Sequence, residues 1–355
     1  MRLTTFCKYV DQPIVLNKLD KKMPTLLIAA GSTFGVFDSF KKSKVDSSQK
    51  DRVFRNIIVI SSTIGASLVG TRGLKLGNKK IFKGLMESVQ LSELQKKQSI
   101  AVNKFLNTTK ISDSTVLNAL NTAKKKELSL KQIDILTNKL PTSPEKKELF
   151  GVILPQKKNL NSKEIFSEIK RLSLLGLIPV IGGVSGGIVA DLITCNKVST
   201  QHKNIKKRTA DKVKEGLYQY LANIFLCNVG AGTALFIAEK LEKAKKIKSL
   251  TPMKKLAVIL TGITATGIIG GSYIANYISK KCINPLFGEN RNKSLYGERK
   301  PEALDIALHA DDIATAGILS GFKWIEPALP FMYFISGYRA GIGYRNGREI
   351  KDINN

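Results

Sequence analysis

The chain has 355 residues and a formal net charge of +29, because 57 lysines and arginines outnumber 28 aspartates and glutamates. Its mean hydropathy of -0.05 averages apolar and lysine-rich stretches that alternate along the chain. No P-loop, dinucleotide fingerprint, HExxH motif, EF-hand loop, zinc-type cysteine cluster or nucleic-acid-binding motif occurs, so soluble-enzyme chemistry, a cofactor and nucleic-acid binding are unsupported.

Two apolar runs lie near the start of the chain, at residues 23–37 and 56–71. Each is short for a membrane span, and a short basic connection joins them. This pattern favours a helical hairpin in the membrane. We therefore interpret residues 1–74 as an N-terminal tail followed by a membrane hairpin.

The next segment, residues 75–171, is rich in Lys, Asn, Ser and Leu. Helix starts are indicated at Asp113, at Ser129 and at Ser143, where Pro144 takes the first helical position. We expect a soluble helical insert between the second and third membrane spans. Disorder over part of the segment is the alternative.

The strongest apolar runs follow, at residues 172–193, 216–238 and 256–278. Residues 172–190 carry no charge. At about 1.5 Å per residue they make a helix of roughly 29 Å, close to the thickness of a bilayer's hydrocarbon core. We assign residues 172–355 to a main membrane bundle.

The last apolar region, residues 313–338, is interrupted by Lys323, Glu326 and Pro327. We expect one bent span here, with a re-entrant hairpin as the alternative. The predicted fold is thus an all-α, polytopic helical membrane bundle of about six spans, placed in the cell (inner) membrane. Lysines flank the apolar runs, so the expected partners are the bilayer and its anionic headgroups, with a second copy or other membrane proteins.

Glycines recur four residues apart within the apolar runs. The pairs with this spacing include Gly183 with Gly187, Gly267 with Gly271, and Gly317 with Gly321. Such spacing makes a flat stripe that lets two helix backbones approach closely. Helix packing is the interpretation we prefer, and a path lined by small residues is the alternative.

Ser185 lies in the sequence Gly183-Val184-Ser185-Gly186. The motif resembles the GxSG signature of rhomboid intramembrane proteases, in which a serine pairs with a histidine on a later span. His309 is the later histidine here, so the resemblance implies a Ser185–His309 pair. The separation is longer than that family suggests, and no earlier span supplies a histidine for an oxyanion. The alternative is a small hydroxyl bonded back to its own helix.

Asp305, His309 and Asp312 have a spacing that puts them on one helical face. Two carboxylates and an imidazole on one face can hold a divalent cation or relay protons. The alternative is the polar side of an amphipathic helix that lies at the membrane surface.

Further ionisable residues lie near or within the apolar runs: Asp38, Arg72, Asp191, Lys323 and Glu326. Asp38, Arg72 and Asp191 lie near the ends of the runs, and their side chains are expected to extend to the headgroup boundary. Lys323 and Glu326 lie at the expected helix break, where transporters often build their sites, and Asp312 is a further candidate for an ion path.

The function that needs the fewest special residues is a non-enzymatic structural or interaction protein of the membrane, with basic lipid-facing flanks. A small-solute or ion transporter or channel that uses the broken last span is the first alternative. A rhomboid-like intramembrane serine hydrolase is the second.

Overall fold

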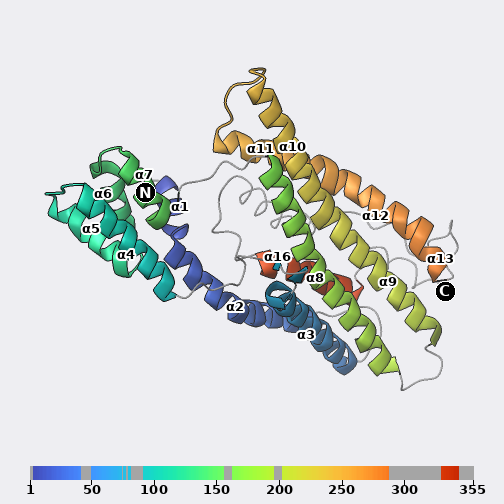
Figure 1. The fold of residues 1–355 in the computed structure, drawn as a ribbon. Helices are drawn as coiled ribbons and strands as arrows, with labels where there is room; N and C mark the ends of the chain where they lie inside the picture. The colour runs from blue at the N-terminus through green and yellow to red at the C-terminus, as the bar shows by residue number, and fades with distance from the viewer. Residues whose placement is uncertain are drawn as a thin grey trace. The chain divides into compact units, whose positions relative to one another are not determined.

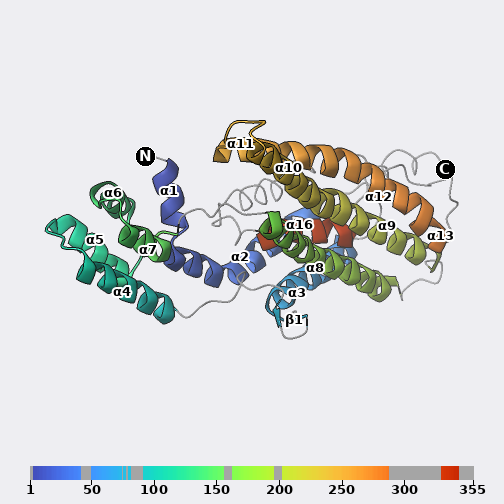
Figure 2. The ribbon, with the colours of Figure 1, turned by 45° about the horizontal axis from the view of Figure 1, so that its top comes forward.

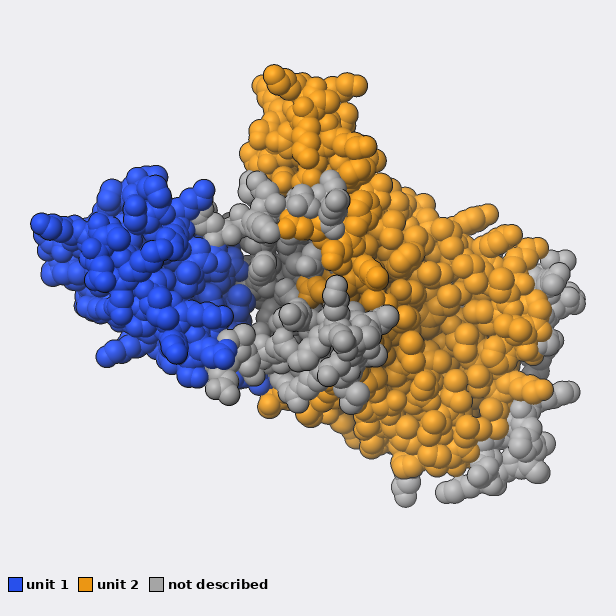
Figure 3. Space-filling view, viewed as in Figure 1, with its two compact units in different colours: residues 1–24, 83–159, 321–327 blue, residues 25–82, 160–320, 328–355 orange. Residues whose placement is uncertain are grey.

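The computed structural model describes residues 3–40, 49–73, 75–76, 79–80, 91–155, 162–195, 202–287 and 329–343. These ranges are almost entirely helical (Figure 1), which confirms the predicted all-α class. Within them, the strands are β1 (Lys75–Leu76) and β2 (Lys79–Lys80), which pair antiparallel. The chain divides into two compact units (Figure 3).

Unit 1 is a set of short helices around a core of its own. Its elements are α1 (Leu3–Val10), the start of α2 (Pro13–Phe40), α4 (Leu91–Thr108), α5 (Ser114–Lys125), α6 (Leu130–Lys139) and α7 (Pro144–Ile153). Leu120, Ile133 and Leu136 are fully buried at its centre. The apolar positions of α5 and α6 recur three to four residues apart, so each helix presents one face to this core.

The predicted helix starts of unit 1 are confirmed. The side chain of Asp113 accepts hydrogen bonds from backbone N–H groups of the first turn of α5. Ser129 forms a capping box with Gln132 at the start of α6, and Ser143 caps α7 with Pro144 in its first turn. Each cap satisfies backbone donors that the helix itself leaves without a partner.

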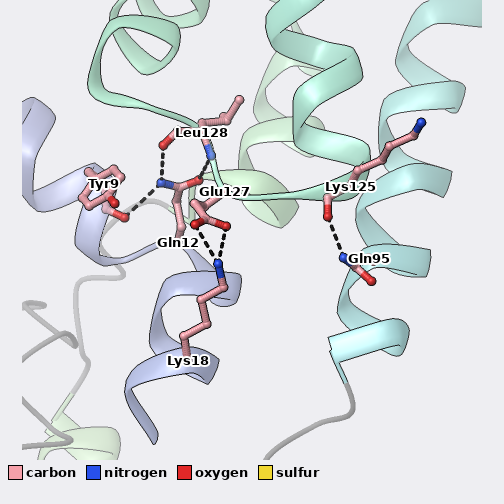
Figure 4. Close-up of polar contacts among 7 residues, drawn as sticks. All are labelled: Tyr9, Gln12, Lys18, Gln95, Lys125, Glu127 and Leu128. Carbon is pink, nitrogen blue, oxygen red and sulfur yellow. Dashed lines mark hydrogen bonds and ion pairs between the residues drawn. The ribbon is translucent and has the colours of Figure 1, made fainter. Parts of the chain in front are cut away.

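The N-terminal segment is attached to the α5–α6 connection of unit 1 (Figure 4). The Gln12 side chain donates to the carbonyl of Leu128 at 2.9 Å and accepts from the Leu128 N–H at 2.7 Å. It also donates to the Tyr9 carbonyl at 3.0 Å. Lys18 contacts both oxygens of Glu127, at 2.7 and 2.8 Å. Two residues of the segment thus bind neighbouring residues that lie more than 100 positions away in the sequence.

Unit 2 contains the long apolar helices (Figure 2). Its elements besides the rest of α2 are α3 (Gln49–Gly73), α8 (Ser162–Cys195), α9 (His202–Tyr220), η2 (Leu221–Phe225), α10 (Leu226–Lys243), α11 (Pro252–Ile263), η3 (Thr264–Gly271), α12 (Ser272–Ile278), η4 (Ser279–Ile283), α13 (Asn284–Leu286) and α16 (Leu329–Ile342). The segments η2, η3 and η4 are π-helical. Because η2 joins α9 to α10 without a break, these three elements form one continuous rod.

Three helical stretches among the described residues are long and apolar enough to cross a membrane: Ile169–Thr194, Ile205–Lys243 and Lys254–Leu286. The stretches Thr25–Phe40 and Val53–Leu68 are apolar but shorter. The count of six spans stays a prediction. The predicted domain boundaries also stay predictions. Residues 313–328 of the expected bent span lie outside the described ranges.

The basic stretch between two predicted apolar runs is partly helical. Residues 194–215 separate the runs 172–193 and 216–238, but α9 already begins at His202. Its residues 210–212 and 214–216 are buried in unit 2. Its high lysine content does not distinguish a buried helix from an exposed loop, because both can carry charged residues.

Adjacent glycines give α8 two packing faces in unit 2. A methyl group at Gly182 or Gly186 would collide with Ala66 or Ser62 of α3. A methyl group at Gly183 would collide instead with the carbonyl of Gly337 in α16. The bare backbone therefore lets α8 approach two different helices closely, as small residues do where membrane helices pack.

Candidate functional site: charges buried in the apolar bundle

Unit 2 encloses ionisable side chains among its helices. Of its described residues, six of charged type are at most 5% exposed: Asp191, Asp211, Lys212, Lys214, Glu215 and Arg339. They are three acids and three bases, so their formal charges cancel. Removing an ion from water costs several kcal/mol, roughly, even after relaxation. Residues kept at that cost in a membrane bundle are candidates for function.

The centre of this set is Asp191, near the end of α8. Its Oδ2 accepts a short hydrogen bond from the Lys212 ammonium of α9. The guanidinium groups of Arg55 in α3 and Arg208 in α9 each lie 3.9 Å from Asp191 Oδ1. Three helices therefore meet at one carboxylate.

Glycines make the contact between Lys212 and Asp191 possible. The stem of Lys212 passes over Gly187 of α8, where an added methyl group would lie 2.7 Å from Lys212 Cε. Gly343, with a φ of 65°, faces the same stem from the end of α16. Gly187 was predicted to pack against a neighbouring helix. Its surroundings are the backbone of Gly341 together with the Lys212 side chain.

The outer face of α8 beside Asp191 is apolar. Asp191 is only 3% exposed, whereas Val189, Leu192 and Ile193 on the same turns of α8 are about half exposed, at 47%, 49% and 49%. The carboxylate therefore points into the bundle while its neighbours point away from it. Basic residues of α3 and α9 compensate the charge of Asp191 inside the protein, so its side chain does not extend into solvent. Its expected depth at the headgroup boundary stays a prediction.

A line of polar side chains continues along the α9–η2–α10 rod. Gln219 donates to Glu215 Oε1 at 2.8 Å, and Asn223 donates to Gln219 Oε1 at 2.9 Å. Asn228 donates to Ser173 of α8 at 3.2 Å. The step of five residues from Asn223 to Asn228 would leave the buried face in an α-helix. It matches about one turn of a π-helix, which η2 supplies.

A second polar contact joins α16 to α2. The buried Tyr338 donates its hydroxyl proton to Asp38 Oδ2 at 2.9 Å. Close by in α2, Ser39 accepts from the Asn56 amide of α3 at 2.9 Å. Asp38 was expected at the headgroup boundary, and it is partly exposed. Its contact with Tyr338 shows that it also holds two helices of the bundle together.

The structure locates some of the predicted site residues. Ser185 lies on α8 with an exposed side chain. Gly267 and Gly271 face Cys227 and Ala222 of the α9–η2–α10 rod, which a methyl group at either position would crowd. The other predicted residues lie outside the described ranges: Asp305, His309, Asp312, Gly317, Gly321, Lys323 and Glu326. The proposed pairing of Ser185 with His309 and the proposed cation site therefore stay predictions.

The sequence reading missed the charged residues of α9. One signal was available: Asp211, Glu215, Gln219 and Asn223 recur every four residues up to and into the apolar run. That spacing places polar groups on one face of a helix. Arg339 gave no such signal, because it follows an apolar run and resembles an ordinary flanking charge.

The comparisons with known proteins give no relative. No family model matches the chain, no curated protein matches it, and no solved structure matches its fold.

Proposed function

We propose that the chain is a multi-pass integral membrane protein that serves as a structural or interaction component of the membrane, with its basic flanks against anionic headgroups. Three described helices are long and apolar enough for a membrane. The observation that supports a structural role is the pairing at Asp191. Three helices share one buried ion cluster there, while the outer face of α8 beside it is apolar.

This arrangement suits a rigid component. Buried polar contacts can specify which helices meet and in what register. We infer that the contacts at Asp191 do so in this bundle. Gly183 and Gly337 bring the α8 and α16 backbones into contact, and Ser62 donates to the Gly182 carbonyl at 2.7 Å. Small residues and interhelical hydrogen bonds of this kind hold membrane helices together.

Two measurements test the proposal on the purified full chain. After an alkaline carbonate wash of membranes, the protein is expected in the pellet. In sealed vesicles that contain it, proton and potassium flux are expected to equal those of empty vesicles. Recovery in the wash supernatant would refute membrane integration, and a flux above that of empty vesicles would refute a purely structural role.

We infer ion or small-solute transport as the second candidate. It is favoured by one observation, the hydrogen-bonded line of Glu215, Gln219 and Asn223 inside the bundle. A buried carboxylate in such a line is what an ion path uses. The residues predicted for this role, Asp312, Lys323 and Glu326, belong to the same proposal.

The flux assay separates the two candidates at the level of residues. If transport occurs, Glu215→Gln is expected to abolish it, because the amide cannot carry the negative charge. Glu93→Gln, at an exposed position of unit 1, is the control and should transport normally. Glu326→Gln in the same assay tests the predicted last span, and intact flux in that variant would remove Glu326 from the path.

A further inference from the structure

We propose that the junction of α3, α8 and α9 binds the phosphate of an anionic phospholipid headgroup through the guanidinium groups of Arg55 and Arg208. This inference depends on the membrane location proposed above and names the lipid contact of the Asp191 cluster. It differs from a general attraction of basic flanks, because it places one headgroup at two defined side chains.

The distances at Asp191 show a surplus of positive charge. Lys212 contacts Oδ2 directly, whereas Arg55 and Arg208 are both 3.9 Å from Oδ1. That distance exceeds the 2.7–3.2 Å, approximately, of a hydrogen bond. One carboxylate is thus shared by three cations, which gives these four residues a net charge of +2 (three positive, one negative).

The helix ends around the cluster carry the same surplus. Among the side chains that the structure describes there, basic residues number five: Arg55, Lys206, Lys207, Arg208 and Lys212. Acidic residues number three: Asp51, Asp191 and Asp211. The surplus of two positive charges makes a field that attracts an anion.

The two guanidinium groups are placed where an anion can reach them. The side chain of Arg208 is 37% exposed and that of Arg55 is 19% exposed, whereas that of Lys212 is only 6% exposed. Arg55 Nε donates to the carbonyl of Asp51 at 3.2 Å, which orients its guanidinium plane. Because a guanidinium is planar and has five N–H donors, it suits phosphate oxygens better than an ammonium does.

Apolar side chains beside the cluster favour a lipid over free phosphate. Phe54 of α3 is 47% exposed, and Leu192 and Ile193 of α8 are each 49% exposed. A phospholipid uses both parts of such a surface, with its phosphate on the arginines and its acyl chains on the apolar residues. Inorganic phosphate uses only the arginines. Basic pockets between membrane helices bind anionic headgroups in this way.

The test counts the lipid that stays with the purified protein. The full chain is reconstituted in phosphatidylcholine containing phosphatidylglycerol, extracted into detergent and examined by native mass spectrometry. The double variant R55Q/R208Q is expected to bind phosphatidylglycerol about thirtyfold more weakly. That factor corresponds to about 1 kcal/mol for each basic residue near the headgroups. Equal retention by this variant and the unchanged protein would overturn the proposal.

Two matched variants separate a defined site from general charge. K96Q/K97Q removes the same two charges from exposed positions of α4 in unit 1, outside the basic flanks, and should retain the lipid normally. Equal loss in this variant would overturn the proposal. R55K/R208K keeps the charge and should regain part of the affinity. Circular dichroism checks that R55Q/R208Q and R55K/R208K are both folded. If both are folded and R55K/R208K binds phosphatidylglycerol as weakly as R55Q/R208Q, the proposal is also overturned.

A last comparison identifies the source of the phosphate. Inorganic phosphate added to the detergent-solubilised protein should not displace phosphatidylglycerol if the apolar contacts contribute. Displacement at equal concentration would assign the site to free phosphate and overturn the lipid proposal. A chain that fails to enter vesicles contradicts the proposed function itself. A chain that enters them without preferring phosphatidylglycerol contradicts only this inference.

Discussion

Lys212 reaches Asp191 by passing over the bare α-carbon of Gly187. An added methyl group at Gly187 would lie 2.7 Å from Lys212 Cε, well inside van der Waals contact. Gly187 therefore leaves room for the Lys212–Asp191 ion pair as well as for close helix packing. A buried charge and a close helix contact in this bundle depend on the same position.

Gly187→Ala is expected to destabilise the protein. The methyl group collides with the Lys212 stem and with the carbonyl of Gly341, and overpacking of this kind costs about 1–3 kcal/mol. Thermal unfolding of the full chain in detergent measures the change. Gly65→Ala in α3 is the control, because nothing lies within 4 Å of the added methyl group. Its expected effect is neutral or stabilising, since alanine is the better helix former.

Asp191→Asn is expected to destabilise the bundle by about 3–5 kcal/mol, because it removes the carboxylate that contacts the buried Lys212 ammonium. Adding Lys212→Met should restore much of the loss by removing the second charge as well. Unfolding of both single variants and the double variant gives the coupling between the residues. Additive effects would show that the two side chains do not act as a pair.

Gln12→Ala is expected to loosen the N-terminal segment from unit 1. It leaves the buried N–H and carbonyl of Leu128 without the partners shown in Figure 4, at a cost of about 1–3 kcal/mol for each unsatisfied group. Amide hydrogen exchange at Leu128 should speed up. Gln95→Ala, which removes one exposed bond to the Lys125 carbonyl, is the comparison and should leave that exchange rate unchanged.

The contact between Lys18 and Glu127 is expected to weaken in acid. The hydrogen bond from Lys18 lowers the pKa of Glu127 below its usual 4.5. A carboxyl whose pKa is lower in the folded state stabilises the fold above the unfolded pKa. That contribution is lost as the pH falls through the folded pKa, so the loss begins below about 4.5.

Nuclear magnetic resonance titration of the Glu127 carboxyl checks this expectation. Lys18→Met should raise its pKa toward the ordinary value. The effect on stability is expected to stay within about 1 kcal/mol, because Lys18 is half exposed and Glu127 is 29% exposed. An unchanged pKa in Lys18→Met would show that the ion pair does not form in solution.

The sequence by itself determined the features that depend on neighbours along the chain. Asp113, Ser129 and Ser143 start helices because each bonds to backbone groups within three residues of itself. The long apolar runs likewise indicate helices that leave water, because hydropathy and helix rise are local quantities. Neither feature requires knowledge of which helices meet.

Only the tertiary structure decided the inner contacts of unit 2. Lys212 and Asp191 are 21 residues apart, and nothing in the stretch between them marks the pair. Lysine in a basic segment looks like a flanking residue until the faces of α8 and α9 are known. The free energy of a buried charge is set by the residues that enclose it, and those come from helices far apart in sequence.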